Sequence, residues 1–415
     1  MALKKKPVTG MKDSLPEEME LRDYLIGIIK DTYRSFGFTP METPCVEHIE
    51  NLTSKQGGDN EKLIFKILKR GEKLVIDSES TENDLADSGL RYDLTLPLSR
   101  YYANNGAKLP QPFKALQVGS VWRADRPQKG RFRQFTQCDI DILGEASSLA
   151  EIELITATGT ALKRICPDNS FTVRVNDRRI LKALVSWAGF PEDAADSVLI
   201  TLDKMDKIGE EGVKQELMEN GFAGEAADKY LSLLASLGND ADAVRGLEET
   251  LGEHLEKGTA GNLAGIMDTV AQVTGGAFGI SFDPTLVRGM GYYTGPIFEV
   301  SMEGFGGSVA GGGRYDKMVG RFTGQDTPAC GFSIGFERII TILMDTEFRI
   351  PGQRVKKAFL FDKKLDGERL SEVLKKAAEA RAEGADVLVV KMAKNKKFQR
   401  EQLALQGYTE FVDFV

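Results

Sequence analysis

Two strand-like halves meet at a basic turn in Val121-Trp122-Arg123-Ala124-Asp125-Arg126-Pro127-Gln128-Lys129-Gly130-Arg131-Phe132-Arg133-Gln134-Phe135. Four arginines and one lysine lie between Arg123 and Arg133. An antiparallel pair of strands joined in this way directs several guanidinium groups toward one polyphosphate, and the ring of Phe135 can stack on a base. The segment therefore predicts a nucleotide-binding β-hairpin, with a solvated charged hairpin as the alternative from charge alone.

Further strands are predicted on both sides of this turn. They comprise Phe113 to Trp122, Gln134 to Leu143, Thr172 to Asn176, and a hairpin in Leu63 to Asp77. An amphipathic helix is predicted from Glu17 to Ser35. The strands come in runs and do not alternate strictly with helices. This order favours an α+β fold, an antiparallel sheet with flanking helices, over a doubly wound parallel sheet.

Composition and charge divide the rest of the chain. The segment from Asp193 to Leu255 is rich in Ala, Leu, Glu and Lys, and residues 192–257 carry a net charge of −11. Strand character returns at Ile280 to Ile340, and Arg354 to Val415, with a net charge of +4, alternates strands with helices. We expect a core in two parts, 1–192 and 258–345. A helical insertion, 193–257, separates them, and a small C-terminal α/β domain, 355–415, follows.

The composition excludes several classes of protein. Among the 415 residues, 54 basic and 62 acidic side chains give a net charge of −8, which argues against indiscriminate binding of polyanions. The four cysteines lie far apart and only two histidines are present, so neither structural zinc, haem nor a disulfide framework is expected. No apolar run approaches the roughly 18 residues of a membrane span, and the N-terminus is not a signal peptide. We therefore expect a cytoplasmic protein without membrane contact.

Four further motifs follow one another along the chain. They are Leu90-Arg91-Tyr92-Asp93-Leu94-Thr95-Leu96-Pro97, Leu286-Val287-Arg288-Gly289-Met290-Gly291-Tyr292-Tyr293-Thr294-Gly295, Ala310-Gly311-Gly312-Gly313-Arg314-Tyr315-Asp316 and Gly331-Phe332-Ser333-Ile334-Gly335-Phe336-Glu337-Arg338. Together with the basic hairpin, these motifs resemble the ordered signatures of the histidyl-tRNA synthetases, a family of class II aminoacyl-tRNA synthetases. The resemblance runs from about Gly10 to Asp345, and Phe38 to Pro44 resembles the motif through which class II enzymes dimerise. It implies a class II catalytic core, an anticodon-binding-like C-terminal domain and a homodimer.

The resemblance also implies roles in ATP binding. The ATP-binding side chains would be Arg123, Asp125, Arg131, Arg133, Phe135 and Arg338. Arg123 and Arg338 match arginines that hold the α- and γ-phosphates, with Arg131 and Arg133 assisting, while Phe135 matches the adenine-stacking position. The glycine cluster Gly304 to Gly313 would let the backbone approach a bound substrate.

Metal and catalytic roles are implied in the same way. Magnesium would arrive with ATP near Glu337 or Asp316, so that no metal site of protein ligands alone is expected. Arg288 matches an arginine of these synthetases that contacts both the amino-acid carboxylate and the α-phosphate. The implied catalytic residues are therefore Arg288, Arg123 and Arg338.

For the amino acid, the implied set is Asp93, Thr95, Gln137, Asp141, Arg288, Tyr292 and Tyr293. Asp93 and Thr95 correspond to groups that receive the α-ammonium, with Gln137 beside them. Asp141 and Tyr293 match the groups that hold the two imidazole nitrogens, and Tyr292 lines the pocket. The family commonly has an aspartate where this chain has Gly291.

These residues imply ATP-dependent activation of histidine to histidyl-adenylate and its transfer to tRNA(His). Two alternatives keep the same fold. One is a catalytically silent paralogue similar to the histidine-binding regulatory subunit of ATP phosphoribosyltransferase, and the other activates histidine for an acceptor other than tRNA. The arginines that would hold phosphate oppose the silent paralogue, because a binding subunit does not require them.

Overall fold

The computed structural model describes residues 3–53, 60–128, 130–289, 291–303, 307–346 and 348–415. The chain separates into two compact units. The large unit comprises Met1–Asp13 and Leu25–Leu343, and the C-terminal unit comprises Ser14–Tyr24 and Met344–Val415. Among the described residues, no helix combines the length and the apolar character that crossing a membrane requires.

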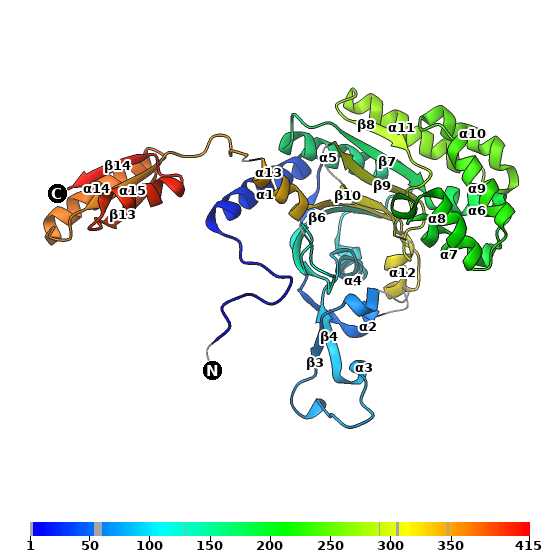
Figure 1. The fold of residues 1–415 in the computed structure, drawn as a ribbon, viewed down its shortest axis with the longest axis horizontal. Coiled ribbons are helices and arrows are strands. Elements are labelled where there is room, and N and C mark those ends of the chain that lie inside the picture. The colour runs from blue at the N-terminus through cyan, green and yellow to red at the C-terminus, as the bar shows by residue number, and fades with distance from the viewer. Residues whose placement is uncertain (1–2, 54–59, 129, 290, 304–306, 347) are drawn as a thin grey trace. The chain divides into compact units, whose positions relative to one another are not determined.

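Figure 1 labels most of the helices and strands. The helices are α1 (Pro16–Ser35), α2 (Ile49–Thr53), α3 (Glu82–Leu85), α4 (Thr95–Asn105), α5 (Leu149–Ile165), α6 (Arg178–Ala188), α7 (Ala195–Leu202), α8 (Met205–Glu219), α9 (Gly224–Ser236), α10 (Ala241–Leu251), α11 (Thr259–Thr274), α12 (Lys317–Thr323), α13 (Phe336–Asp345), α14 (Gly367–Ala382) and α15 (Lys396–Leu405). The strands are β1 (Thr39–Pro40), β2 (Val46–His48), β3 (Lys66–Leu68), β4 (Ala86–Leu90), β5 (Phe113–Trp122), β6 (Gln134–Leu143), β7 (Phe171–Asp177), β8 (Gly279–Phe282), β9 (Pro296–Met302), β10 (Ser308–Arg314), β11 (Ala329–Gly335), β12 (Lys356–Phe361), β13 (Asp386–Lys391) and β14 (Glu410–Phe414).

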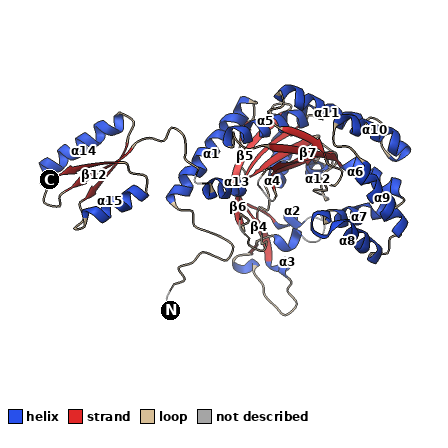
Figure 2. Ribbon diagram, turned by 45° about the horizontal axis from the view of Figure 1, so that its top comes forward, coloured by secondary structure: helices blue, strands red, loops and turns tan. Residues whose placement is uncertain are grey.

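The large unit is built on one sheet, whose strands follow the order β1-β5-β6-β11-β10-β9-β7-β8 in the described part of the chain. The strands from β5 to β7 in this order all pair antiparallel, and β1 and β8 add parallel edges. Figure 2 shows helices around this sheet. The predicted antiparallel sheet with flanking helices is confirmed, and β5 and β6 have the predicted bounds.

The alternation of residue types along β6 explains the two faces of the sheet. Cys138, Ile140 and Ile142 are buried and apolar, and α5 packs against β6 and β11. Successive side chains of a strand point to opposite faces, so the polar residues between these positions share the other face. One face of the sheet therefore forms the core, and the other is free to carry a binding site.

All the regular elements between β7 and β8 in the described residues are helices, from α6 to α11, joined by short turns. The predicted insertion at 193–257 lies within this region. The helical region begins earlier and ends later than the insertion because α6 and α11 are also amphipathic; α6 packs against β7, and α11 packs against α5, α10 and β8. The outer helices thus join the insertion to the core of the large unit.

The predicted hairpin from Leu63 to Asp77 is wrong. The strand β3 pairs with β4, and residues 74–77 form no strand. Val75 and Ile76 alternate poorly with polar neighbours and are both about two-thirds exposed, at 67% and 69%. Gly89 in β4 allows the chain before β3 to approach β4 closely, because a Cβ atom at Gly89 would lie only 3.1 Å from the carbonyl oxygen of Phe65.

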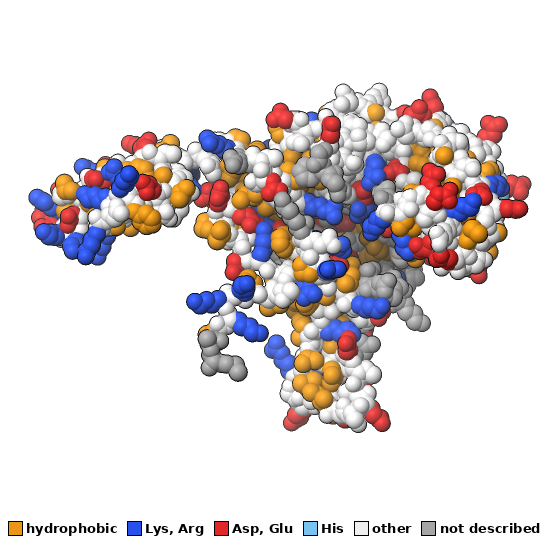
Figure 3. Space-filling model, viewed as in Figure 1, with side chains coloured by type: hydrophobic (Ala, Val, Ile, Leu, Met, Phe, Trp, Pro, Cys, Tyr) orange, Lys and Arg blue, Asp and Glu red, His pale blue; other side chains and the backbone are white. Residues whose placement is uncertain are grey.

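The C-terminal unit has a parallel sheet of order β13-β12-β14. Phe359 packs with α14 on one face, while Ala358 and Leu360 pack with Leu403 of α15 on the other. The strands and helices expected in this segment are present. Figure 3 shows Lys and Arg side chains gathered on this unit.

Candidate functional site

A cavity of about 720 Å³ opens on the polar face of the large sheet. Strands β6, β10 and β11 form its floor, and loops, the start of α4 and the start of α13 form its walls. Asp203 and Lys207 reach it from the helical region. The residues predicted from sequence that line it are Asp93, Thr95, Arg123, Asp125, Arg131, Phe135, Gln137, Asp141, Arg288, Tyr292, Tyr293 and Arg338.

Three polar side chains of β6 stand on the floor of this cavity, at every second residue: Gln137, Asp139 and Asp141. The Tyr315 hydroxyl donates a hydrogen bond to Asp141 Oδ1 at 2.6 Å. Burial raises the pKa of Asp141 to about 7, although the bond from Tyr315 opposes this shift. Burial and the charge of Asp141 raise the pKa of Asp139 well above its usual range. The floor thus holds two carboxyl groups that are costly to ionise without a ligand.

Glycines allow the floor to pack closely. A Cβ atom at Gly331 would lie 2.0 Å from Asp141 Oδ1, and one at Gly312 would lie 2.1 Å from the carbonyl oxygen of Gly331. Gly312 belongs to the predicted glycine cluster, of which residues 304–306 lie outside the described part of the chain. A side chain at either position would displace the strands, so the glycines set the depth of the cavity.

The start of α4 brings a third carboxyl group to the cavity. Asp93 Oδ1 accepts a hydrogen bond from the Leu96 backbone N–H at 3.1 Å, in the manner of a helix cap. Burial raises the pKa of Asp93, and the bond from Leu96 opposes this. Thr95, the first residue of α4, lines the cavity beside it.

Aromatic rings hold Arg123 in place. Its guanidinium carbon lies 4.2 Å from the centre of the Tyr92 ring and 5.2 Å from that of the Phe135 ring. Arg123 Nε also donates to the Tyr92 carbonyl oxygen at 3.1 Å. Cation–π contacts of this kind fix a guanidinium group without consuming all its donors.

The other basic residues of the hairpin differ in direction. Arg131 pairs with Asp125 at 3.0 Å, and both line the cavity. Arg133 donates to the carbonyl oxygens of Asp125 at 3.1 Å and Thr9 at 3.4 Å, and it is not among the residues that line the cavity. Lys129 lies outside the described residues. The geometry therefore gives no direct support to the expected ATP contact of Arg133.

Arg288 enters the cavity from the loop before Tyr292 and pairs with Glu299 of β9. The Glu299 side chain is only 5% exposed, and it also pairs with Arg174. Sequence reasoning missed Glu299, although it is the one charged residue in the otherwise apolar or hydroxyl-bearing run of β9. It also missed Tyr315, because in that motif the role near magnesium was expected for the neighbouring Asp316. The hydrogen bond to Asp141 is what shows that Tyr315 belongs to the site.

Tyr292 and Tyr293 form a wall, with ring centres 4.4 Å apart and planes tilted by 55°. Burial raises the pKa of both hydroxyl groups, so they stay protonated and can donate hydrogen bonds. Gly289 has a φ of +59°, and a Cβ atom there would lie 2.0 Å from Tyr293. The tight turn that directs the tyrosines inward therefore requires glycine at this position.

The two carboxylates proposed near a magnesium ion lie differently. Glu337 lines the cavity and accepts a hydrogen bond from the Thr136 backbone N–H at 3.1 Å. Asp316 does not line it, and accepts bonds from the Ala329 N–H at 2.9 Å and Arg314 at 3.3 Å. In the described residues, no group of three or more His, Cys, Asp or Glu side chains could hold a metal ion. Glu337 alone fits a metal that comes bound to a substrate.

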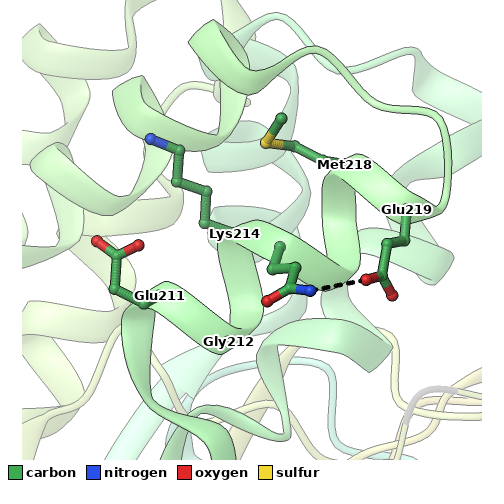
Figure 4. A pocket seen from close by; sticks show the side chains of 6 residues that line it. Glu211, Gly212, Lys214, Met218 and Glu219 are labelled. Carbon is green, nitrogen blue, oxygen red and sulfur yellow. Dashed lines mark hydrogen bonds between the residues drawn. The ribbon is translucent and has the colours of Figure 1, made fainter.

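A second hollow, of about 490 Å³, lies along α8. Figure 4 shows its side chains, all from this one helix, and the hydrogen bond from Gln215 to Glu219 at 2.9 Å. No group from another element converges on it among the described residues. The cavity on the sheet is therefore the candidate active site.

Comparisons with known proteins concern the chain as a whole. The family model for histidyl-tRNA synthetase matches residues 10–339. A histidine–tRNA ligase of Leifsonia xyli subsp. xyli is 44% identical over 98% of this chain and 94% of its own length, and one of Christiangramia forsetii is 38% identical over 83% and 77%. The crystal structure of histidyl-tRNA synthetase from Nostoc sp. PCC 7120 has a TM-score of 0.80 and 27% identity, covering 98% of this chain and 90% of that one. The chain belongs to the histidyl-tRNA synthetase family.

Proposed function

We propose that this protein is a histidine–tRNA ligase that activates histidine with ATP and transfers the histidyl group to tRNA(His). One observation carries the proposal: a single cavity holds three arginines from separate motifs opposite a floor of buried carboxyl groups. Arg123, Arg288 and Arg338 come from the hairpin, the loop before Tyr292 and α13. A site of this kind suits a reaction between a polyphosphate and the carboxylate of an amino acid. The buried carboxyl groups suit the ammonium group and the imidazole of that amino acid.

The hairpin and α13 form the ATP end of the site in this proposal. Arg123 and Arg338 hold the α- and γ-phosphates, Arg131 assists, and the adenine stacks on Phe135 beside Asp125. Guanidinium groups suit phosphates because their donors match two oxygens at once. Magnesium, entering with ATP near Glu337, would add positive charge at the phosphates.

Arg288 serves the chemical step. An oxygen of the histidine carboxylate attacks the α-phosphorus, the bond from that phosphorus to the bridging oxygen breaks, and pyrophosphate leaves with its electron pair. The carboxylate and phosphate repel each other as they approach, and a fixed cation between them lowers this barrier. Glu299 keeps the Arg288 side chain oriented, because its own carboxylate is buried and paired with two arginines.

The floor selects histidine. Asp141 accepts a hydrogen bond from one imidazole nitrogen, and Tyr293 donates one to the other. Tyr315 holds the Asp141 carboxyl group, and Tyr292 lies beside them. Asp93, Thr95 and Gln137 receive the α-ammonium. A side chain that cannot pair with these buried groups loses on the order of 1 to 3 kcal/mol for each one left unsatisfied.

The remaining parts of the proposal concern partners. The basic C-terminal unit contacts tRNA(His), and two copies of the chain associate through Phe38 to Pro44. The protein acts in the cytoplasm, where its tRNA substrate is found.

The decisive experiment is histidine-dependent exchange of labelled pyrophosphate into ATP, run beside the other amino acids and followed by charging of tRNA(His). Exchange with histidine and charging of the tRNA support the proposal. Absence of exchange indicates a silent, histidine-binding paralogue. Exchange without charging indicates a different acceptor, and exchange with another amino acid shows that the imidazole pocket is misassigned.

A further inference from the structure

We propose that Asp139 is an additional histidine-binding residue, whose carboxylate accepts the α-ammonium group of the substrate. The inference rests on the proposed function and deepens it. It assigns a role to a cavity residue that neither the motifs nor the comparisons single out.

Asp139 has an uncommitted oxygen inside the cavity. The residue is 3% exposed, and its Oδ1 atom has no hydrogen-bond partner among the described residues. The carboxyl group accepts a long bond from Gln137 Nε2 to Oδ2 at 3.4 Å and a bond from Ser333, and neither of them involves Oδ1. A buried carboxylate oxygen without a partner is costly, so a cationic ligand that pairs with it gains free energy.

Asp93, the residue expected to receive the ammonium group, is less available. Its Oδ1 atom already accepts the bond from the Leu96 N–H that caps α4. Both carboxyl groups line the same cavity, and the charge of Asp93 raises the pKa of Asp139. Asp139 therefore complements Asp93, and it offers an oxygen that no helix cap occupies.

The register of the sheet places Asp139 at a suitable distance from Arg288. Gly311 of β10 lies opposite Ser333 of β11, which lies opposite Asp139 of β6. Residues directly opposite each other point to the same face, and two strand spacings amount to about 10 Å. An Arg288 terminal nitrogen lies 3.5 Å from where a Cβ atom of Gly311 would be, so the guanidinium group stands over the Gly311 end of this row.

A zwitterionic amino acid fits this span. Each of the two hydrogen bonds at its ends is about 2.9 Å long. The carboxylate oxygens and the ammonium nitrogen of one α-carbon are about 3 Å apart by standard bond lengths. The sum, about 9 Å, is close to the roughly 10 Å that two strand spacings put between Gly311 and Asp139. With Arg288 above Gly311, the carboxylate can face the arginine while the ammonium faces the aspartate.

The side chain of histidine then points along β6. Asp141 lies two residues beyond Asp139 on the same strand, or about 7 Å away, so with a hydrogen bond at each end one histidine molecule can contact both carboxyl groups. The Asp141 carboxyl group already holds the Tyr315 hydroxyl and has a second oxygen without a partner among the described residues. In this arrangement Asp139 binds the α-ammonium group and Asp141 binds the imidazole of one histidine molecule.

The test uses three ligands that differ in one group each. Histidine carries both α-groups, histidinol keeps the ammonium but lacks the carboxylate, and 3-(imidazol-4-yl)propionate keeps the carboxylate but lacks the ammonium. Their dissociation constants are measured by calorimetry on the full chain with wild-type protein, Asp139→Asn and Asp141→Asn. Asp87→Asn, at an exposed position of β4, is the matched control.

We expect Asp139→Asn to weaken histidine and histidinol by about ten- to a hundredfold, as expected when a bond between charged groups is removed, and to leave imidazolylpropionate within about twofold. Asp141→Asn should weaken all three ligands, and Asp87→Asn none. Equal weakening of all three by Asp139→Asn, or no weakening of histidine, would overturn the proposal. If Asp139→Asn does not fold, Asp139→Ser is compared with the same ligands and judged by the same criteria.

Failure of the proposed function gives a different result. A protein that activates another amino acid binds none of the three ligands, and its pyrophosphate exchange responds to that amino acid. A silent paralogue binds histidine but gives no pyrophosphate exchange. A wild-type protein that binds histidine with an unaffected Asp139→Asn variant leaves the proposed function intact and removes only the role of Asp139.

Discussion

The sheet of the C-terminal unit is covered by helices on both faces, whereas the sheet of the large unit has one face in the core and one face that lines a cavity. In the C-terminal unit, Phe359 faces α14 and Leu360 faces α15, so both faces of β12 are apolar and covered. In the large unit, Ile140 lies in the core while Asp139 and Asp141, on the other face of β6, line a cavity. A sheet covered on both faces stabilises the fold. A sheet with one uncovered face is destabilised by its buried carboxyl groups and gains a binding site.

Among the substitutions proposed for the cavity face of the large sheet, replacement of Arg288 by alanine should lower the rate of pyrophosphate exchange the most. A cation fixed between two reacting anions contributes about 3 to 4 kcal/mol, so pyrophosphate exchange should fall by about 10²- to 10³-fold. The melting temperature should change little, since the arginine side chain is half exposed. Arg34→Ala, at an exposed position of α1, is the control. Exchange within a few-fold of wild type would remove Arg288 from its proposed role.

Leu360→Ala tests the packed face in the same way. Leu360 is fully buried, and removal of such a side chain costs about 2 to 5 kcal/mol of unfolding free energy. Hydrogen exchange of the α15 amides should report this loss in the C-terminal unit, while pyrophosphate exchange stays within about twofold. Leu374→Ala, at a 48% exposed position of α14, should cost less than about 0.5 kcal/mol. A large drop in pyrophosphate exchange with Leu360→Ala would show that the two units do not work independently.

Asp141→Asn should affect the choice of amino acid more than the binding of ATP. The substitution keeps the shape and one acceptor for Tyr315 but removes the charge. We expect the KM for histidine to rise by about ten- to a hundredfold, with the KM for ATP within about twofold. Equal changes in both constants would indicate that the substitution disturbs the whole cavity.

The same residue predicts a pH dependence. Because its pKa is about 7 in the empty site, the Asp141 carboxyl group is protonated below pH 7 and ionised above it. If the ionised form accepts a hydrogen bond from the imidazole, the KM for histidine should fall as the pH rises through 7. Asp141→Asn should lose this component and keep the titrations of free histidine and of the other carboxyl groups of the cavity. Identical pH profiles for the two proteins would contradict the assignment.

Neutralising Lys394, Lys396 and Lys397 should have the smallest effect per residue. These exposed lysines lie before and at the start of α15. Their replacement by alanine should weaken tRNA binding and reduce its salt dependence by about one counterion for each phosphate that the variant no longer neutralises, with pyrophosphate exchange unchanged. The matched control replaces Lys363, Lys364 and Lys375, from the α14 side of the same unit. Equal effects of both triples would mean that charge alone, and not one surface, binds the tRNA.

The sequence predicted the fold well wherever local signals were strong. The strands β5 and β6 have the expected bounds because their apolar periodicity is long and the turn between them contains proline and glycine. The hairpin from Leu63 to Asp77 failed because short apolar runs such as Val75 and Ile76 do not specify their partner. The partner strand, β4, lies beyond residue 85.

The site was predicted in the same uneven way. Motif resemblance placed twelve residues that line the cavity, but it also included Arg133, which the fold turns toward the backbone of Thr9 and Asp125. Neighbouring arginines of one hairpin look alike in sequence. Their directions depend on the strand pairing and on what lies beside each face.

By itself, the sequence determined the order of the elements, the alternation of apolar and acidic residues along β6, and the identity of the basic hairpin, because these depend on neighbours a few residues apart. Only the tertiary structure decided that Glu299 pairs with Arg288, that Tyr315 holds Asp141, and that Asp139 keeps an oxygen without a partner among the described residues. Glu299 lies on the strand that follows the Arg288 loop, but Tyr315 and Asp141 lie far apart along the chain. Their contact exists because the register of β6, β11 and β10 places them on one face, and register is set by the packing of the whole sheet.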